Sequence, residues 1–567
     1  MTKSDSVEVL VVGGGPTGLT AACELARRGV SFRFIEKLDK ANDKSRALVV
    51  HARTLELLRI MGCADKFVEN GFAIRALNIF DGEKRIAHLP LNQIDSHYQF
   101  ALGIPQYETE KLLQDHLNSL GGKLERAKEL SSVQEMDEHL IATIRSADGS
   151  EEKIKCSYMI ACDGAHSTVR KAVNEPFEGG EYQETFQLAD VQVDWGDKGV
   201  PGELFAFSSA TGNAAFFPMP KSRWRVVVIL PENLPEEELK KEPELSEIQA
   251  KVDEVLPWKI KLSDPVWLAN FKIRYRKVRS YRHGRIFLAG DAAHVHSPFG
   301  GQGMNTGMQD AYNIAWKLAL AAKGQATEEL LDSYQFERHA VAAQLLKSVD
   351  MMTRVNLLRA PIAREIRNRL APLLISQEPV QAKLRKFITE IGINYRKSPV
   401  VAESTRSLVR AALSTTASEE PKLGDWFEFS QGPHAGDRAP DAHMSEPNGN
   451  TIETADLFKT CKHTLLLLTG DAPDSDVYKH FSKLAQEAAG KYGNFLEIKV
   501  ITSELNPPEG LDFRGTVYSD PDYSVHERYG AGAPCMYIIR PDAYVGYRSQ
   551  PAEIEGVEEY FNRIIRA

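Results

Sequence analysis

Hydrophobic positions near the start of the chain form two short runs with a helical pattern between them. The apolar runs cover residues 7–12 and 31–35, and a glycine-rich turn leads into the helical pattern over 16–28. A strand, a helix and a second strand within about 30 residues predict a β-α-β unit. Later strand-like runs end at Cys162 and just before Gly290. The chain therefore begins with the pattern of an α/β domain.

The middle of the chain has a different pattern. Residues 72–105 and 125–160 are strand-like, and Asp81-Gly82 is a hairpin turn signal. Residues 180–230 are rich in aromatic and β-branched side chains, which predicts the strands of a second sheet. A helical pattern covers residues 107–120, 231–256, 303–322 and 327–375.

A change of pattern also separates the C-terminal part. Residues 398–435 mix Ser, Thr, Pro and charged residues with little periodicity, so we interpret them as a linker. Strands and helices then alternate again, with helices near 475–490 and from about 552. The predicted domains are a discontinuous first domain (1–71, 106–178 and 273–397), an interleaved β-sheet domain (72–105 and 179–272), the linker (398–435) and a C-terminal α/β domain (436–567).

Composition and charge mainly exclude classes of protein. Hydrophobic residues make up 43% and charged residues 26%, which is typical of a soluble globular protein. The net charge of −9 disfavours nucleic acid as a partner, and no apolar run reaches the roughly 18 residues of a membrane span. The six cysteines form no CxxC motif, so we expect reduced thiols in a cytoplasmic protein. His294 and His296 have no third ligand nearby in the sequence, and we expect no metal site.

The first motif with a chemical meaning is GGGPTG at positions 13–18. It lies between a predicted strand and a predicted helix and reads as G-x-G-x-x-G. Gly13 permits the tight turn, Gly15 lets a pyrophosphate approach the backbone, and Gly18 lets the helix pack closely against the strand. Glu36 ends the second strand, where an acid accepts ribose hydroxyls. The motif predicts dinucleotide binding but does not distinguish FAD from NAD.

The second motif opens with Gly290-Asp291 and identifies the cofactor. The run 285–318 resembles the GD fingerprint of flavoprotein monooxygenases related to para-hydroxybenzoate hydroxylase and phenol hydroxylase. The resemblance implies that Asp291 accepts a hydrogen bond from a ribityl hydroxyl of FAD. It also implies that the glycines over 300–303 let a loop lie against the isoalloxazine ring, with the next helix directed at its N1–C2=O edge. Taken alone, Asp291 could equally be a helix N-cap.

Three smaller matches agree with this family. Asp163-Gly164 resembles its DG motif, although a turn before a Ser-capped helix would look the same. Arg46 with Arg53, and Gln106 with its helix, resemble segments that lie along FAD. The residues that we expect to hold FAD are Gly13, Gly15, Pro16, Thr17, Gly18, Glu36, Lys37, Arg46, Arg53, Gln106, Asp163, Gly164, Gly290, Asp291, Pro298, Gly301, Gly303, Met304 and Asn305.

The resemblance continues to the end of the chain. Residues 393–399 match the segment that closes the hydroxylase part in three-domain members, and 436–441 resemble the start of their thioredoxin-like C-terminal domain. RPDAYV at 540–545 resembles that domain's RPDGYV signature, with Ala543 where glycine is usual. Cys461 and Cys535 are not a redox pair, so we expect a structural or assembly role, and a homodimer is compatible with the family. The polyketide and rifamycin-type hydroxylases are the more similar members.

The implied reaction uses FAD, NADPH or NADH as co-substrate, and O2. In this family a flavin C4a-hydroperoxide hydroxylates an electron-rich aromatic substrate, here a phenolic or polyketide-like compound, and no nucleophilic residue is required. Two alternatives remain open, namely Baeyer–Villiger or quinone-directed oxygenation by the same flavin, and an uncoupled NAD(P)H oxidase. Each would use the same cofactor site.

The substrate side is less defined than the flavin side. Phenol hydroxylase has an Asp where this chain has Leu48, so a base of that kind is not expected here. Pro298 is expected near the flavin edge. Aromatic residues of the second sheet are the candidates for the pocket wall, although each could equally belong to the core of the sheet: Phe205, Phe207, Phe216, Phe217 and Met219.

Overall fold

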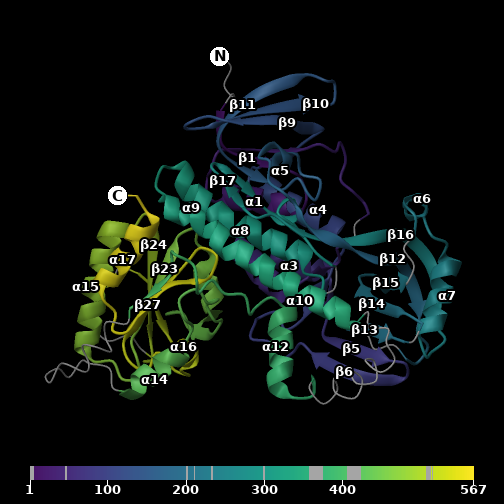
Figure 1. Cartoon of the computed structure of the whole chain (residues 1–567). Helices are drawn as coiled ribbons and strands as arrows, with labels where there is room; N and C mark the ends of the chain where they lie inside the picture. The colour runs from purple at the N-terminus through teal and green to yellow at the C-terminus, as the bar shows by residue number, and fades with distance from the viewer. Residues whose placement is uncertain are drawn as a thin grey trace.

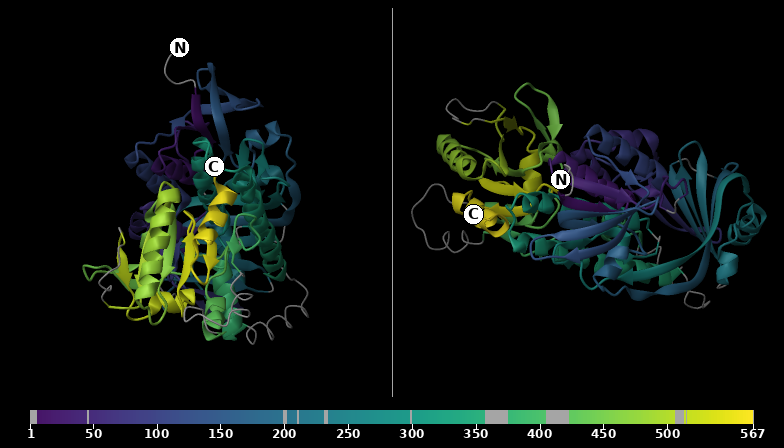
Figure 2. Two further views of the ribbon diagram at one scale, coloured as in Figure 1. Left: turned by 90° about the vertical axis from the view of Figure 1, so that its left-hand side faces the viewer. Right: turned by 90° about the horizontal axis from the view of Figure 1, so that it is seen from above.

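The structure is a computed structural model that describes residues 6–44, 47–198, 202–209, 211–230, 234–297, 300–356, 375–404, 423–505, 513 and 515–566. Within these ranges the strands form three eight-stranded sheets and one three-stranded sheet. Figures 1 and 2 show the three large sheets in a row, with the C-terminal residues (green to yellow) at one end and the sheet of residues 178–277 at the other. This mixed α/β architecture with a separate C-terminal domain is the one that the sequence predicts.

The central sheet is built on the predicted β-α-β unit. β1 (Ser6–Val12) pairs in parallel with β2 (Phe32–Glu36) on one side and with β11 (Glu151–Ala161) on the other, and α1 (Pro16–Arg27) connects β1 to β2. The apolar end of β1 is buried, as expected for a central parallel strand. The remaining strands are β8 (Glu125–Arg126), β9 (Lys128–Glu135), β10 (Leu140–Ser146), β17 (Arg282–His283) and β18 (Ile286–Leu288).

Helix α8 (Gly303–Ala322) runs through the middle of the molecule beside α1 (Figure 1). It is buried on almost every side, and its buried polar side chains, such as Asn305, Asp310 and Lys317, have hydrogen-bond partners. Its ends coincide with the predicted range 303–322. The other helices of this part are α2 (Ala52–Met61), α3 (Ala64–Asn70), α4 (Gln106–Ser119), α5 (Thr168–Ala172), the 3-10 turn η1 (Gly290–Ala292), α9 (Glu328–Tyr334), the π-helical turn η2 (Gln335–His339), α10 (Ala340–Asn356) and α12 (Glu378–Ile388).

The second sheet has α7 (Leu245–Val255) on one face and the three-stranded sheet on the other. Where one helix was expected over 231–256, the structure has α6 (Glu236–Leu239) and α7, because Pro243 precedes a new capping box between Glu244 and Glu247. The strands of the second sheet are β19 (His294–Val295), β16 (Lys261–Lys277), β12 (Glu178–Asp194), β15 (Arg223–Leu230), β14 (Asn213–Met219), β13 (Glu203–Ser208), β5 (Ala76–Asp81) and β6 (Lys84–Pro90), and those of the small sheet are β3 (Val49–Val50), β7 (Ala101–Gly103) and β4 (Phe72–Ile74).

The C-terminal sheet is centred on the buried strand β23 (His463–Leu468). β23 pairs in parallel with β24 (Leu496–Thr502) and antiparallel with β26 (Cys535–Ile539), and α15 (Ser475–Tyr492) connects β23 to β24. The other elements are β20 (Ala402–Glu403), α14 (Leu423–Gln431), β21 (His443–Ser445), β22 (Thr451–Glu453), η3 (Thr454–Lys459), β25 (Val517–Ser519), α16 (Ser524–Tyr529), β27 (Val545–Ser549) and α17 (Ile554–Ile564).

The stretch 398–435 differs from the expected linker at both ends. β20 adds a strand beside β27, and α14 packs the buried Phe429 near Tyr537. A two-residue strand carries no periodicity, so the sequence pattern could not reveal it. Residues 405–422 lie outside the described part of the chain. Among the described helices, none is long and apolar enough to cross a membrane.

Candidate functional site

The glycine motif forms the turn between β1 and α1, and two of its glycines are required by close backbone contacts. Gly13 has φ +107°, and a Cβ atom there would lie 2.3 Å from the carbonyl oxygen of Cys162. A Cβ atom at Gly18 would lie 1.9 Å from the carbonyl oxygen of Gly13. Gly15 is different, because a Cβ atom there would meet no atom within 4 Å. Gly15 therefore borders open space at the N-terminus of α1.

This N-terminus has the features of an anion site. No side chain caps α1, and Pro16 occupies its first turn. Unpaired N–H groups at a helix start attract phosphate groups. Glu36 closes the turn, since its carboxylate accepts hydrogen bonds from Gly14 N (2.6 Å) and Leu38 N (2.9 Å). Lys37 is exposed beside it.

The second glycine motif packs directly onto the first through Thr17. A Cβ atom at Gly290 would lie 2.6 Å from Thr17 Oγ1, and one at Gly307 would lie 2.5 Å from the same oxygen. Gly290 also has φ +57°, in the left-handed region. The exposed Asp291 follows in η1. Both predicted motifs therefore meet at the N-terminal end of α1.

Asp310 on α8 holds the second motif in place. Its Oδ2 accepts from Gly290 N (3.1 Å) and lies 2.7 Å from His294 Nε2, while its Oδ1 accepts from Arg338 Nε at 2.7 Å. Burial alone would raise the pKa of Asp310, but Arg338 and His294 lower it below its ordinary value. His294 is thus a structural partner of a buried carboxylate. No group of three or more His, Cys, Asp or Glu in the described ranges could hold a metal.

The glycine-rich loop before α8 is fastened to β3. Asn305 Oδ1 accepts from His51 N (2.8 Å), and its Nδ2 donates to Val49 O and Gly301 O, both at 2.8 Å. His51 Nε2 lies 2.7 Å from Gly300 O, and burial lowers the pKa of His51 to about 4, so the ring is neutral near pH 7. Gly300 and Gly301 have φ +89° and +65°. These contacts hold Gly300 and Gly301 against the β3 region.

Replacing Asn305 by alanine should lower the free energy of unfolding by about 2–4 kcal/mol. The change leaves His51 N, Val49 O and Gly301 O without their partner in a buried site. Urea unfolding of variant and wild type at one pH measures the difference. A difference below roughly 0.5 kcal/mol, the typical effect of a surface change, would contradict this role for Asn305.

The Asp163-Gly164 segment caps a helix and also carries a carboxylate oxygen without a hydrogen-bond partner. Asp163 Oδ2 accepts from Thr168 N (2.7 Å) and Val169 N (3.1 Å) at the start of α5, and Ser167 Oγ accepts from Arg170 N. These contacts cap α5, as expected if the segment were only a turn before a Ser-capped helix. Asp163 Oδ1, however, is buried without a hydrogen-bond partner. Arg170 Nη1 donates to Ala292 O (3.0 Å), which joins this segment to η1.

Not every predicted residue lies at this edge of the sheet. The Arg53 guanidinium turns instead to the C-terminal domain, where it donates to Asp542 O and lies 4.7 Å from the Tyr544 ring centroid. Gln106 Nε2 donates to Glu110 Oε1 (2.8 Å) at the start of α4. Arg46 and Pro298 lie outside the described residues, and Gly303 and Met304 form the half-buried first turn of α8.

The aromatic residues of the second sheet separate onto two faces. Phe205 and Phe207, like Phe216, pack in the core beneath α7 with Trp224. Phe217 belongs with Met219 to an apolar cluster on the opposite face, which also contains Leu48 and Val49 of the β3 region. A Cβ atom at Gly301 would lie 3.2 Å from Val49 Cβ, so this cluster adjoins the glycine-rich loop. Phe205, Phe207 and Phe216 therefore leave our set of candidates for the pocket wall, whereas Phe217 and Met219 remain in it.

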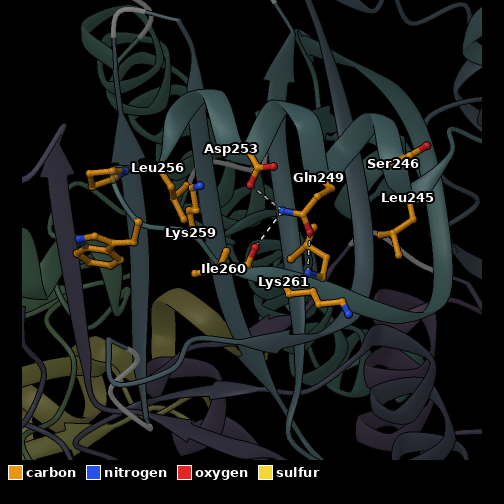
Figure 3. Close-up of a pocket in the computed structure, with 11 residues that line it drawn as sticks. Leu245, Ser246, Gln249, Asp253, Leu256, Lys259, Ile260 and Lys261 are labelled. Atoms are coloured by element: carbon orange, nitrogen blue, oxygen red, sulfur yellow. Dashed lines mark hydrogen bonds between the residues drawn. The ribbon is translucent and has the colours of Figure 1, made fainter.

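A separate hollow of about 730 Å³ lies between α7 and the start of β16 (Figure 3). Gln249 crosses it, donating to Asp253 Oδ1 and Ile260 O and accepting from Leu262 N. Figure 1 places α7 at the outer edge of the second sheet, away from α1 and α8. This hollow is therefore not part of the site formed by the glycine motifs.

The features of the site fit a dinucleotide. The starts of α1 and α8 have no side-chain cap, Gly15 leaves room for close approach, and Asp163 Oδ1 is a buried acceptor without a donor. Phosphates and ribityl hydroxyls supply the matching acceptors and donors. The sequence did not reveal His51, because its partner Gly300 is 249 residues away and no local pattern connects the two.

Comparisons with known proteins agree with this site. The family model described as "FAD binding domain" matches residues 6–349. The 6-methylpretetramide 4-monooxygenase of Streptomyces rimosus is 31% identical over 97% of this chain and 92% of its own length. The rifampicin monooxygenase of Streptomyces venezuelae is 32% identical over 68% of this chain and 79% of its own.

One solved structure extends the similarity to the whole chain. OxyS anhydrotetracycline hydroxylase from Streptomyces rimosus superposes with a TM-score of 0.73 and 25% identity, over 99% of each chain. The family model covers more than half of the sequence, and the relatives include proteins that cover nearly all of it. The chain therefore belongs to the FAD-binding monooxygenases related to para-hydroxybenzoate hydroxylase, close to the polyketide and rifampicin hydroxylases, and is a flavin-dependent aromatic monooxygenase.

Proposed function

We propose that this enzyme hydroxylates a phenolic or polyketide-like aromatic compound with electrons from NAD(P)H. The balanced reaction takes the aromatic C–H, O2, NAD(P)H and a proton to the phenol, NAD(P)⁺ and water. The observation that carries the proposal is the meeting of the three predicted motifs, 13–18, 163–164 and 290–291, beside the apolar cluster of Leu48, Phe217 and Met219. Bound FAD would accept the two electrons of the nicotinamide and activate O2 for oxygen transfer.

The residues of the chain would bind and orient this cofactor. The start of α1 would hold the pyrophosphate, and Glu36 and Asp163 would accept from hydroxyl groups. Asp291 and the loop at 300–303 would hold the ribityl chain and the ring. The start of α8 would place N–H groups and the positive end of its dipole near the negative charge of a reduced flavin. Neutral His51 would add no charge to the loop.

The apolar cluster favours a substrate that is itself largely apolar. Its members Leu48, Val49, Ile74, Leu91, Ala101 and Met219 carry no formal charge, and Leu204 and Phe217 pack beside them. Burying a carboxylate against such a surface would be costly without a paired cation. The similarity to proteins named 6-methylpretetramide 4-monooxygenase and rifampicin monooxygenase is compatible with a polyketide-like substrate.

Oxidation of NADPH and NADH by the purified holoenzyme, with a panel of phenols and polycyclic aromatic compounds, tests the proposal. Product mass and H2O2 are measured in the same samples. We expect oxidation that the substrate stimulates, a product heavier by one oxygen atom, and little H2O2. Oxygen insertion into a ring ketone would identify the Baeyer–Villiger alternative, and H2O2 with every compound would favour the uncoupled oxidase.

Phe217 and Phe205 form a matched pair for testing the pocket wall. Phe217→Ala should raise the KM for the aromatic substrate about tenfold or more, because the substrate would lose its contact with the half-buried Phe217 ring beside the loop. Phe205→Ala should instead lower the free energy of unfolding by about 3–5 kcal/mol and leave the KM of the folded fraction unchanged. Steady-state kinetics and urea unfolding of both variants distinguish these effects. An unchanged KM for Phe217→Ala would remove this face from the site.

We infer that the C-terminal domain has a thioredoxin-like fold without thioredoxin chemistry. The support is the central β23 with its parallel and antiparallel neighbours β24 and β26, and α15 between the parallel pair. Cys535 is fully buried, and burial raises the pKa of its thiol far above its ordinary value. Such a thiol would not be a reactive nucleophile.

A further inference from the structure

The turn between β26 and β27 inserts buried charges from the C-terminal domain into the flavin-binding domain. Arg540 and Asp542 are 1% and 2% exposed, and Ala543 between β26 and β27 has φ +56°, in the left-handed region where glycine is favoured. Asp542 Oδ2 accepts from Trp316 Nε1 and Asn313 Nδ2 of α8, both at 3.2 Å. The turn is therefore in direct contact with the helix that begins beside the glycine-rich loop.

Glu337 in η2 is the centre of this contact. Both of its oxygens accept from Arg540, at 2.6 and 2.9 Å, and Lys317 Nζ donates to Oε2 at 2.8 Å. Asn313 and Ser398 complete the set of donors at 2.7 Å each. Burial opposes ionisation of Glu337, but Arg540 and Lys317 outweigh it and lower its pKa. The C-terminal domain therefore supplies, through Arg540, the first of the two cations that keep this buried carboxylate charged.

The π-helical turn η2 connects this contact to the flavin site. Glu337 and its neighbour Arg338 are both buried, and they face different partners. Arg338 donates to Asp310 Oδ1 (2.7 Å), Thr306 O (3.1 Å) and Tyr395 Oη (2.8 Å). Asp310 in turn accepts from Gly290 N in the second glycine motif. π-Helical turns are rare and occur often at functional sites.

A second connection runs from the same turn through Arg53. Its Nη2 donates to Asp542 O (2.7 Å), and its Nη1 donates to Glu56 on the same helix (2.9 Å). Arg53 N donates to Thr389 O (3.2 Å), the residue after α12. Phe387 O of α12 accepts from Nε2 of Gln302 (2.8 Å), the N-cap residue of α8. Residues 540–544 are therefore linked, through these side chains, to Gly290 and to Gln302, which both border the proposed flavin site.

We propose that Arg540 and Asp542 are positioning residues of the flavin site, through which the C-terminal domain sets the affinity of the enzyme for FAD. They act through Glu337, Arg338 and Asp310 on the turn at Gly290, and through Arg53 on α2. The proposal rests on the FAD binding that the family establishes and is independent of the substrate. It assigns the C-terminal domain a role in cofactor binding rather than in redox chemistry.

Arg540→Lys and Asp542→Asn test the proposal in the full-length chain. We expect the dissociation constant of FAD, measured by flavin fluorescence on the apoenzyme, to rise about tenfold or more, within the usual range of coupling between sites. Arg548→Lys is the matched control. Arg548 is also a buried arginine of the C-terminal sheet, but its partners are Glu403, His434 and the backbone near Phe429, all outside the flavin-binding part.

The control separates positioning from general stability. Thermal unfolding of the three variant apoproteins gives their stabilities. Arg548→Lys should leave the FAD dissociation constant within about twofold of the wild-type value, even if its melting temperature falls as much as those of Arg540→Lys and Asp542→Asn. Equal dissociation constants for all variants and the wild type would overturn the proposal. If the wild type itself failed to bind FAD, the proposed function would fail instead, so the two failures are distinguishable.

Hydrogen exchange on the wild-type protein gives a test without any substitution. Coupling is reciprocal, so FAD binding should slow exchange of the amides at 540–545 if these residues help to hold the cofactor site. Amides of α15, which Figure 1 shows at the outer edge of the C-terminal domain and away from α8, should not change. Identical exchange at 540–545 with and without FAD would contradict the proposal even if every variant failed to fold.

Discussion

Replacing Gly15 by valine should give a folded protein that no longer retains FAD. The backbone at Gly15 has φ −77° and ψ −177°, an extended conformation that any residue adopts. A Cβ atom there would touch nothing within 4 Å in the protein, so the apoprotein has no steric reason to unfold. The valine side chain would occupy the space through which a pyrophosphate must approach the start of α1. Overpacking of about 3 kcal/mol corresponds to a loss of FAD affinity of roughly 100-fold.

The measurement is the FAD dissociation constant of the apoprotein, together with its urea unfolding curve. Gly490→Val is the matched control, because Gly490 on α15 also borders open space but lies in the C-terminal domain. The control should bind FAD as the wild type does. A yellow Gly15→Val protein with an unchanged dissociation constant would show that the pyrophosphate does not approach at this turn. Gly18→Val should behave differently, since its side chain would meet the backbone of Gly13 and disturb the fold itself.

This contrast between glycines shows what local sequence can predict. The turn at 13–18 and the bounds of α8 follow from short-range patterns, namely apolar runs, glycines at fixed spacing and a 3.6-residue period. The structure confirms the predicted helix over 303–322 at both ends. It also reveals that Gly13 and Gly18 are needed for packing, whereas Gly15 borders space that a ligand would fill.

Contacts between distant segments were not predictable in the same way. His51 meets Gly300 across 249 positions, and Arg53 meets Asp542 across 489. Arg53 was expected along FAD because its motif resembles the family, yet its guanidinium lies in the interface with the C-terminal domain. The motif thus identified an important residue, while the direction of its side chain depends on a domain that begins hundreds of residues later in the chain.

The second sheet shows a similar limit, because the sequence does not predict which face of the sheet is covered. The two-residue period of a strand predicts that Phe205 and Phe207 share a face, and that Phe217 and Met219 share one. It does not predict which face α7 covers, because α7 comes later in the chain and its packing depends on tertiary contacts. Only the structure separates the core side from the side that adjoins the glycine-rich loop.

Replacing Glu390 by glutamine should stabilise the protein at alkaline pH and leave it unchanged near pH 4. Glu390 follows α12 and is 3% exposed, with φ +62°. Its carboxyl accepts from Gln309 Nε2 (2.5 Å) and lies 3.2 Å from Thr306 Oγ1, both on α8. Burial is the main cause that raises its pKa, to about 8, against the lowering effect of Arg338.

The sign of the effect follows from proton binding. An unfolded glutamate ionises near pH 4.3, so between about pH 4.3 and 8 the folded state holds a proton that the unfolded state has lost. The wild type therefore loses stability as pH rises through this range, by up to about 5 kcal/mol above pH 8. Glutamine does not titrate and matches the shape of the protonated carboxyl. The variant should thus be more stable by a few kcal/mol at pH 8.5.

Urea unfolding of wild type and variant at matched values from pH 4 to pH 9 measures the difference. Comparison at each pH removes the contribution of buried histidines such as His51, whose lowered pKa weakens the fold of both proteins as pH falls below about 6.5. Glu329→Gln, at an exposed position of α9, should follow the wild type throughout. A difference that is constant with pH would mean that Glu390 titrates alike in the folded and unfolded states. A difference in the free energy of unfolding that widens from pH 4.3 towards pH 8 would mean that Glu390 is a neutral carboxylic acid in the folded protein. The helix α8, which begins at the proposed flavin site, would then pack against this neutral acid through Thr306 and Gln309.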